Sequence, residues 1–372
     1  MGRWRSFDRR IYNHHMCALQ AVILLLAFIK PLVAQTTEEI AAKAEAYIST
    51  SGFRGSILLA KDGKIILAKG YGLANIELDV ANSPETKFRF GSITKQFTAA
   101  AILQLEERGK LKVGDKASKY IPGAPLAWSD ITIHHLLTHT SGIPSYTNEA
   151  GNKAHMRDHI GAPLDFIKKF QDLQLEFAPG EKFRYNNSGY FLLGVIVEQV
   201  SGLKYEDYLR VNVFEPLQMT NTGYDWSATI LEGRASGYSK STDGLEVNAD
   251  LLDMGQPYAA GSLYSTVMDL YKWDRALYTT KVLNAQSLEA AFTPGRYDWG
   301  DGIKYGYGWG ITNVHGHKAV GHGGGINGFS TVIWRAIKED TTSIVLSNTD
   351  FLNVGKIGMD LLELVLGSLL SH

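Results

Sequence analysis

Patterns typical of β-strands lie near both ends of this 372-residue chain, and a long helical stretch separates them. Near the start, β-prone residues fill 55–60 and 65–72, with an Asp-Gly pair at 62–63 between them. An Asp-Gly pair in that position is a strong hairpin signal. A sheet that contains both sets of strands has to bring the two ends of the chain together. The later predicted strands are 308–312, 329–335 and 343–347.

The middle of the chain is predicted to be mostly helices and loops. Apolar residues at helical spacing predict helices at 94–108, with one apolar face, at 188–200 and at 266–277. Consecutive hairpin-like strands favour an antiparallel sheet over a βαβ arrangement. We therefore expect an α/β fold of the α+β type, in which helices flank an antiparallel sheet built from both ends of the chain. The predicted sheet subdomain comprises about 35–90 and 290–372, with helices at 37–50 and 354–369, and a mainly helical subdomain at about 91–289 is inserted in it.

The N-terminal segment has the order of a secretory signal. Four arginines between residues 3 and 10 precede an apolar run at 17–29 and the small residue Ala34. That run has 13 residues, whereas spanning a bilayer takes about 20. We expect 1–34 to be cleaved and 35–372 to be exported, periplasmic or secreted, with no stable membrane insertion. Because Leu32-Val33-Ala34 is an imperfect cleavage site, an uncleaved N-terminal anchor is the alternative.

Composition excludes several kinds of site. The chain carries 37 basic and 38 acidic residues, and loss of the five basic and one acidic residue in 1–34 would take its formal charge from −1 to −5. A mildly acidic surface gives no reason to expect a nucleic-acid partner. The only cysteine, Cys17, lies in the predicted signal. The mature chain would therefore have no disulfide, no cysteine nucleophile and no thiolate-bound metal.

Ser92-Ile93-Thr94-Lys95 stands at the start of the helix predicted at 94–108. Residues three apart share a helix face, so the Lys95 amine can reach the Ser92 hydroxyl. The N–H groups and positive dipole end of the helix N-terminus can stabilise an oxyanion. Serine is a weak nucleophile without such help. A second Ser-x-x-Lys at 201–204 follows a helix instead and is interpreted as a helix end.

Two other short motifs could complete an acyl-transfer site. Tyr185 and Asn187 come just before the apolar helix at 188–200 and could supply a proton-transfer phenol and a carboxamide from one loop. His322 opens a run with three glycines, at 323–325, ahead of a predicted strand. Glycines there would let a substrate backbone approach closely.

Taken in order, Ser-x-x-Lys, Tyr-x-Asn and His-x-Gly resemble the motifs of the class C β-lactamase and D-alanyl-D-alanine carboxypeptidase family of penicillin-recognising serine hydrolases. The resemblance covers essentially the whole chain after the signal. It implies the fold of the β-lactamases and transpeptidases. Beyond the three motifs, the sequence is also similar to that family at 90–95, 135–142, 179–194 and 214–217.

The resemblance implies a catalytic role for three residues. Ser92 would attack a carbonyl and form an acyl-enzyme. Lys95 and Tyr185 would share the general-base role, and Tyr185 would return a proton to the leaving group. The implied substrate is a small molecule or peptide whose amide or ester bond is hydrolysed (a D-alanyl peptide, a β-lactam or a small ester), without metal or organic cofactor. The alternative is a penicillin-binding sensor that is acylated but turns over slowly.

The resemblance also implies substrate binding by four residues besides the catalytic serine. Asn187 would hold a substrate amide, the backbone N–H groups of Ser92 and Gly325 would bind the oxyanion, and Gly324 would lie beside them. His322 would help to bind a carboxylate or support the catalytic tyrosine. Many β-lactamases of this family have Lys-Thr-Gly where this chain has 322–324. Histidine has an unperturbed pKa of about 6.5 and is only partly charged near neutrality, which weakens the case for a dedicated β-lactamase.

Two further patterns lack the context that their sites require. The glycines within 323–328 match a dinucleotide fingerprint, but they precede a strand instead of opening a helix. His134, His135 and His139 have no glutamate placed as in a His-Glu-x-x-His zinc site. We interpret these histidines as parts of a structural turn, hydrogen-bonded to the backbone, and expect no metal site.

Overall fold

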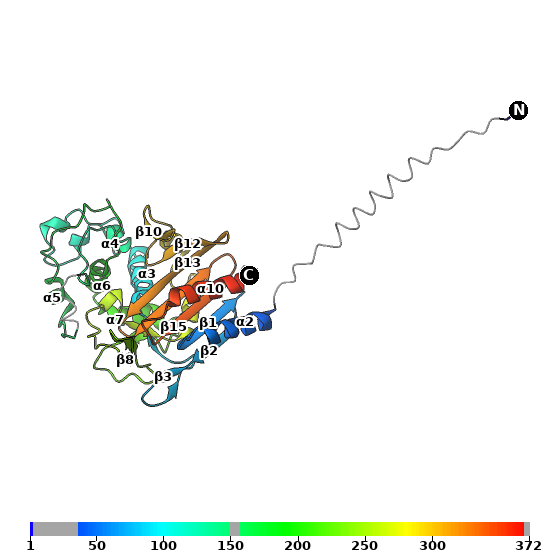
Figure 1. Ribbon diagram of the computed structural model, residues 1–372. Helices are drawn as coiled ribbons and strands as arrows, with labels where there is room; N and C mark the ends of the chain where they lie inside the picture. Colours follow the sequence, from blue (N-terminus) through cyan, green and yellow to red (C-terminus); the bar gives the residue numbers. More distant parts are fainter. Residues whose placement is uncertain (3–35, 149–156, 368–372) are drawn as a thin grey trace.

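The computed structural model of the chain describes residues 1–2, 36–148 and 157–367. Its centre is an eight-stranded antiparallel sheet with the strand order β10-β11-β12-β13-β14-β15-β1-β2 (Figure 1). The first strand pairs with the last along its whole length, from Gly55 opposite Ser347 to Lys61 opposite Thr341. The antiparallel sheet built from both ends, as predicted, is therefore confirmed. Its strands are β1 (Gly55–Lys61), β2 (Lys64–Tyr71), β10 (Asp298–Gly300), β11 (Ile303–Tyr305), β12 (Gly310–Val314), β13 (His317–Ile326), β14 (Phe329–Ala336) and β15 (Thr341–Ser347).

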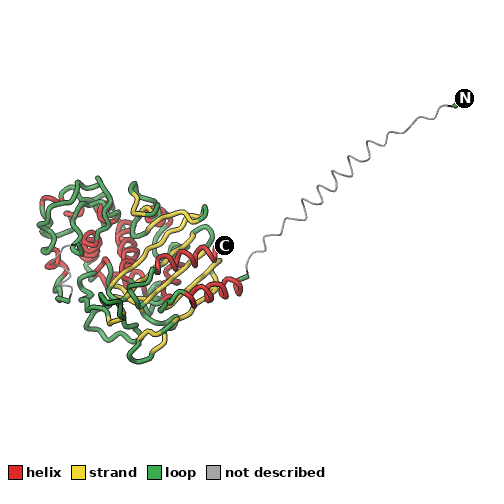
Figure 2. The backbone as a smooth tube through the Cα atoms, in the orientation of Figure 1, coloured by secondary structure: helices red, strands yellow, loops and turns green. Residues whose placement is uncertain are grey.

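Helices cover both faces of this sheet. α2 and α10 lie across one face, and α3 lies behind the other, with α4 to α7 gathered on the far side of it (Figure 1). α8 also contacts the second face, at β1 and β15. Figure 2 shows the strands on one side of the molecule and most loops on the other. The helices are α2 (Thr37–Thr50), α3 (Thr94–Glu107), α4 (Ile133–Leu137), α5 (Pro163–Ile167), α6 (Asn187–Ser201), α7 (Tyr205–Leu209), α8 (Val267–Ala276), α9 (Ala285–Ala291) and α10 (Val354–Leu366).

Two apolar cores result, one on each face of the sheet. In β1, Ile57 and Leu59 join the core beneath α2 and α10, while Leu58 and Ala60 join the core around α3. Successive side chains of a strand point to opposite faces. A strand covered on both faces therefore needs apolar residues at consecutive positions, which is why 55–60 shows no polar alternation.

Short elements complete the chain. A 3-10 turn at Gly91–Ile93 leads into α3, and another at Tyr258–Ala260 packs against α3 and α6.

No helix of the described ranges is long and apolar enough to cross a membrane. The predicted signal lies almost entirely outside these ranges. The remaining strands form three small sheets: β3 (Leu73–Asn75) with β4 (Val80–Ala81), β5 (Phe88–Arg89) with β9 (Leu263–Ser265) and β6 (Gly223–Tyr224), and β7 (Tyr238–Lys240) with β8 (Glu246–Asn248).

The last third of the sheet differs from the sequence prediction. The strand predicted at 308–312 begins at Gly310, because Gly308 has a φ of +80° and turns the chain just before it. β13, which contains the three glycines of 323–325, was not predicted as a strand at all. Glycine has low strand propensity, but β13 pairs with both β12 and β14 and is held by those ladders.

The predicted helix at 94–108 is present as α3, and the side opposite its apolar face is buried as well. Every residue from Thr94 to Leu105 is buried. The small residues at 99–101 allow close packing on the apolar side. Polar side chains on the other side are buried by contacts with their own partners, such as Thr98 with Tyr205 and Gln96 with Trp273.

Candidate active site

Ser92 lies where the helical part of the molecule meets the sheet. It is the middle residue of the 3-10 turn at Gly91–Ile93, directly before α3. Gly91 has a φ of +53°, and a Cβ there would lie 2.9 Å from the carbonyl oxygen of Gly325. A Cβ on Gly324 would lie 1.9 Å from the carbonyl oxygen of Phe90. Glycine at both positions therefore lets β13 pack directly against the serine turn.

The edge of β13 beside Ser92 has no partner strand. β12 pairs with β13 only as far as Gly321, so residues 322–326 pair with β14 alone. Gly325 is exposed, and a Cβ there would meet nothing within 4 Å. This free edge can accept a substrate backbone as an added strand. The predicted oxyanion donors, the N–H groups of Ser92 and Gly325, are thus brought to one place.

Lys95 is fully buried one helical turn after Ser92. Its Nζ lies 3.0 Å from Ser92 Oγ, 2.9 Å from Asn187 Oδ1 and 2.8 Å from the carbonyl oxygen of Ala260. Burial holds the pKa of Lys95 well below its ordinary value. The two carbonyl oxygens can only accept hydrogen bonds, whereas the serine hydroxyl can donate one. A neutral amine therefore fits: its two N–H groups donate to Asn187 and Ala260, and its lone pair faces the Ser92 hydroxyl.

Tyr185 lies against this pair. Its ring centroid is 4.8 Å from Lys95 Nζ. Burial raises the pKa of Tyr185 above its ordinary value, and only the nearby Ser92 opposes this shift. The phenol is therefore protonated at neutral pH. Its hydroxyl is buried and has no hydrogen-bond partner of good geometry in the described part of the chain, so it is an unused proton donor beside the nucleophile.

Asn187 begins α6 and links Lys95 to the adjoining loop. Its Oδ1 accepts from Lys95, and its Nδ2 donates to Thr147 Oγ1 at 3.1 Å. The helix starts here because the side chain of Asn186 caps it by accepting from the Gly189 N–H. The cap fixes the backbone on both sides of Asn186. The side chains of Tyr185 and Asn187 are thereby both directed toward Lys95.

A cavity of about 130 Å³ opens beside Ser92, on the side of Asn187 and Gly325. None of the described side chains that line it is charged. Apolar groups and carboxamides make up most of its wall, contributed by Tyr146, Leu252, Gln256, Pro257, Ile326 and Asn327. This cavity suits an uncharged group attached to the carbonyl that Ser92 attacks.

His322 lies beneath the site instead of lining that cavity. It is 1% exposed, its Nε2 is 2.8 Å from the Tyr305 hydroxyl, and its Nδ1 contacts the Gly323 carbonyl. Burial, assisted by Lys95, lowers the pKa of His322 to about 3. These surroundings contradict the partial charge predicted from the sequence. Support of Tyr185, whose ring centroid is 6.1 Å away, is the part of the prediction that the geometry favours.

His139 is a part of the site that sequence reasoning missed. Its Nδ1 accepts from the Asn186 N–H at 3.1 Å, and its carbonyl accepts from the Arg184 N–H at 2.9 Å. Its ring centroid is 4.4 Å from that of Tyr185. The predicted bond to backbone exists, but to the Tyr-x-Asn segment and not to its own turn. Nothing in the sequence pairs residues so far apart along the chain.

We expect the acceptor on His139 to hold the Tyr185–Asn187 segment in its active position. His139 has a φ of +58°, so the informative variants are ones that tolerate this angle, glycine and asparagine. His139→Gly removes the acceptor, and kcat should fall about tenfold or more, because an unpaired buried N–H costs about 1–3 kcal/mol. His139→Asn places Oδ1 where Nδ1 was and should restore most of kcat. Steady-state kinetics with melting curves check this; equal kcat in the two variants would contradict it.

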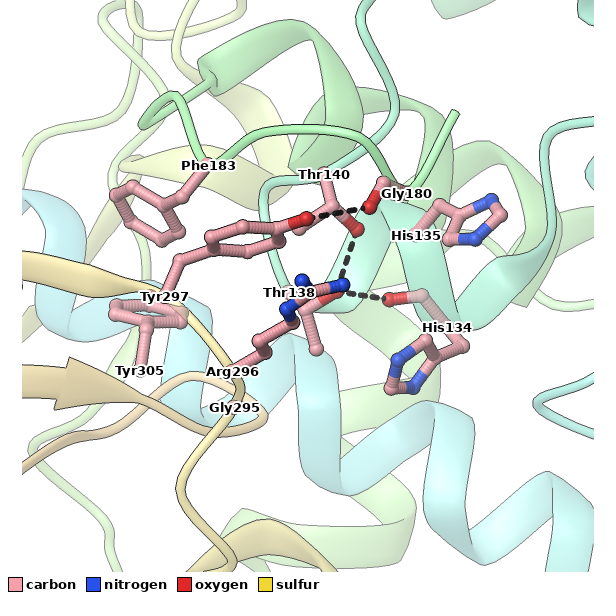
Figure 3. A pocket seen from close by; sticks show the side chains of 10 residues that line it. All are labelled: His134, His135, Thr138, Thr140, Gly180, Phe183, Gly295, Arg296, Tyr297 and Tyr305. Atoms are coloured by element: carbon pink, nitrogen blue, oxygen red, sulfur yellow. Dashed lines mark hydrogen bonds between the residues drawn. The ribbon is translucent and has the colours of Figure 1, made fainter. Parts of the chain in front are cut away.

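The other two histidines line a second cavity of about 220 Å³, which Tyr305 also lines (Figure 3). There His134 Nδ1 lies 2.8 Å from the Tyr307 hydroxyl, and His135 Nδ1 accepts from the Thr132 N–H. His139 does not line this cavity. Within residues 36–148 and 157–367, no group of three or more His, Cys, Asp or Glu side chains is placed to hold a metal ion.

Comparison with known proteins agrees with this geometry. The model of the Beta-lactamase family matches residues 40–366. Penicillin-binding protein 4* of Bacillus subtilis is 33% identical over 315 residues, which are 80% of this chain and 68% of that protein. The chain spans about three fifths of the length of the next curated relatives, 62% and 60%.

Solved structures extend the comparison. The octameric penicillin-binding protein homologue from Pyrococcus abyssi is 33% identical with a TM-score of 0.75, over 89% of this chain and 77% of that one. The D-stereospecific amidohydrolase from a Streptomyces species is 25% identical with a TM-score of 0.73, over 86% of this chain and 97% of that one. The family match covers the whole site, from the serine turn to β13. This chain therefore belongs to the Beta-lactamase family and is a serine hydrolase of the β-lactamase and DD-peptidase type.

Proposed function

We propose that this protein hydrolyses an amide or ester bond next to a compact, uncharged acyl group, through an acyl-enzyme on Ser92. The observation that carries the proposal is the buried Lys95 amine, 3.0 Å from Ser92 Oγ, with two carbonyl acceptors for its own protons. Relatives named as penicillin-binding proteins and as a D-stereospecific amidohydrolase support substrates that contain a D-amino acid.

The acylation step follows from the positions of three side chains. Lys95 Nζ takes the Ser92 proton as Oγ attacks the substrate carbonyl carbon. The N–H groups of Ser92 and Gly325 stabilise the oxyanion. As the bond to the leaving nitrogen or oxygen breaks, that atom takes the Tyr185 proton, and Tyr185 recovers a proton from Lys95. Water then attacks the ester carbonyl, with Lys95 and Tyr185 moving the protons in the reverse order.

Slow deacylation is a second candidate, favoured by one feature of the cavity. None of the described residues that line it is acidic, so none of them offers a carboxylate to activate the deacylating water. Among the residues that the structure describes, deacylation would depend on Lys95 and Tyr185. A sensor that is acylated and turns over slowly would have this arrangement.

A panel of substrates separates the two candidates. A p-nitrophenyl ester, nitrocefin, a D-amino-acid amide and a D-Ala-D-Ala peptide are assayed side by side, with intact-mass spectrometry during turnover. Sustained turnover of the ester or amide is expected for a hydrolase. One burst of product equal to the enzyme concentration, with a persistent acyl adduct, would support the sensor, and no adduct with any substrate would overturn both.

We also propose that the protein acts outside the cytoplasm, periplasmic or secreted. The support is the order of basic, apolar and small residues in 1–34. The N-terminal residue of the protein recovered from its producing cells tests this. A start near Gln35 fits a cleaved signal, and an intact N-terminus in the membrane fraction would instead fit the anchor.

A further inference from the structure

The two sides of the catalytic serine are chemically different. A proton donor has to contact the leaving atom, so the leaving group lies on the side of Tyr185. Tyr185 is not among the residues that line the uncharged cavity, which adjoins Asn187 and Gly325. If the proposed function is right, the acyl group therefore occupies that cavity and the leaving group extends the opposite way, past the Tyr185 ring.

Trp299 forms the wall on the leaving-group side. Its ring stacks on that of Tyr185, with centroids 5.5 Å apart and planes at 6°. The same ring is 5.3 Å from His322 and packs edge-on against Tyr305 at 5.0 Å. Trp299 comes from β10, at the outer edge of the large sheet, and remains partly exposed. A Cβ on Gly310 would lie 3.0 Å from its ring, so glycine at that position makes room for the indole.

The two cationic side chains that flank Trp299 in the sequence, Lys304 and Arg296, lie elsewhere. No lysine or arginine of the described ranges stacks on the Trp299 ring. Lys304 lies on the same hairpin, opposite Asp298 in the strand register. It precedes the buried Tyr305, and successive side chains alternate, so Lys304 points to the face of the sheet away from Trp299. Arg296 instead lines the second cavity, with its guanidinium over the Tyr297 ring (Figure 3).

The face of an aromatic ring interacts differently with anions and with cations. Their quadrupole is negative over the ring, so a carboxylate is repelled while an apolar or cationic group is attracted. A carboxylate placed here would also lose water without gaining a partner, which is costly. An uncharged amide, alcohol or amine leaving group is not repelled by the ring face and loses no charge hydration.

We propose that Trp299 is a specificity-determining residue that selects leaving groups without a carboxylate. The preferred substrates are then amides and esters whose leaving group is ammonia, an amine or an alcohol. Peptides that end in a free D-amino acid, and β-lactams with their ring carboxylate, are disfavoured. In the preferred reaction the C–N or C–O bond breaks, the Ser92 ester forms, and the leaving atom departs with the Tyr185 proton.

A matched pair of peptides tests this. An N-acyl-D-Ala-D-Ala peptide and its C-terminal carboxamide have the same acyl group and differ only in the charge of the leaving group. We expect the native enzyme to hydrolyse the carboxamide at least tenfold better in kcat/KM. Trp299→Lys should reduce or reverse this ratio, because it places a cation where the indole was. Trp299→Phe should keep the ratio, since it keeps an aromatic face.

Lys304→Gln is the control, because it changes charge on the same hairpin but on the other face, and it should leave the ratio unchanged. Melting curves and fluorophosphonate labelling show that each variant is folded and competent. A native preference for the free acid, or a ratio that stays the same in a folded Trp299→Lys variant, would overturn the inference. If neither peptide nor any ester acylates Ser92, the proposed function itself has failed, which is a different result.

Discussion

Replacement of Ser92 by alanine should remove all turnover and all covalent labelling. Loss of a serine nucleophile costs on the order of 10³ or more in kcat in other hydrolases, because no other group can form the acyl intermediate. Ser92 is the residue that Lys95 contacts, in the 3-10 turn that leads into α3. The measurement is kcat with the best ester or amide substrate, together with peptide mapping after treatment with a fluorescent fluorophosphonate or penicillin.

The chain contains its own control for this experiment. Ser201 also begins a Ser-x-x-Lys sequence, but it ends α6 and is followed by Gly202 with a φ of +75°, a helix C-cap. The Ser201 hydroxyl contacts the backbone of Leu203 and not Lys204. Ser201→Ala should therefore retain full activity and labelling. Label found on Ser201, or undiminished in Ser92→Ala, would refute the assignment.

The comparison of these two serines shows what local sequence can predict. Both have a lysine three residues later, and only the position relative to a helix distinguishes them. That position follows from apolar periodicity and from the Ser-Gly pair, which are local signals. The spacing within Tyr185–Asn187 is local in the same way, because one N-cap at Asn186 orients the residues on either side of it.

Other parts of the site depend on contacts that have no local signal. The third partner of Lys95 is a backbone carbonyl at Ala260, and any residue type could supply it. The neutrality of His322 follows from burial against Tyr305, whereas the residue type alone predicted partial charge near neutral pH. β13 was missed for a related reason, since its glycines are selected by close packing on the serine turn and not by strand propensity.

Replacement of Lys95 by methionine should lower kcat about 10²–10⁴-fold, the range for loss of a general base. The pH dependence of the native enzyme should identify the same group. Lys95 acts as a base only when neutral, so kcat/KM rises as pH passes its lowered pKa. Tyr185 donates only when protonated, so activity persists until the pH reaches its raised pKa. The rise of kcat/KM on the acid side of the pH profile should be absent from the residual activity of Lys95→Met. If that rise is unchanged in the variant, it belongs to the titration of another group.

The same variant should be no less stable than the native protein at neutral pH. The folded state holds Lys95 neutral, while the unfolded chain binds a proton there up to about pH 10.4, so the native free energy of unfolding rises with pH across that window. Methionine has similar size and no charge to desolvate, and its variant lacks this slope. Denaturant unfolding at several pH values should therefore show the largest advantage of Lys95→Met at neutral pH and a shrinking one toward pH 10. A variant that is inactive and less stable at every pH would mean that Lys95 is charged in the folded enzyme and is held there by Asn187 and Ala260 as a cation.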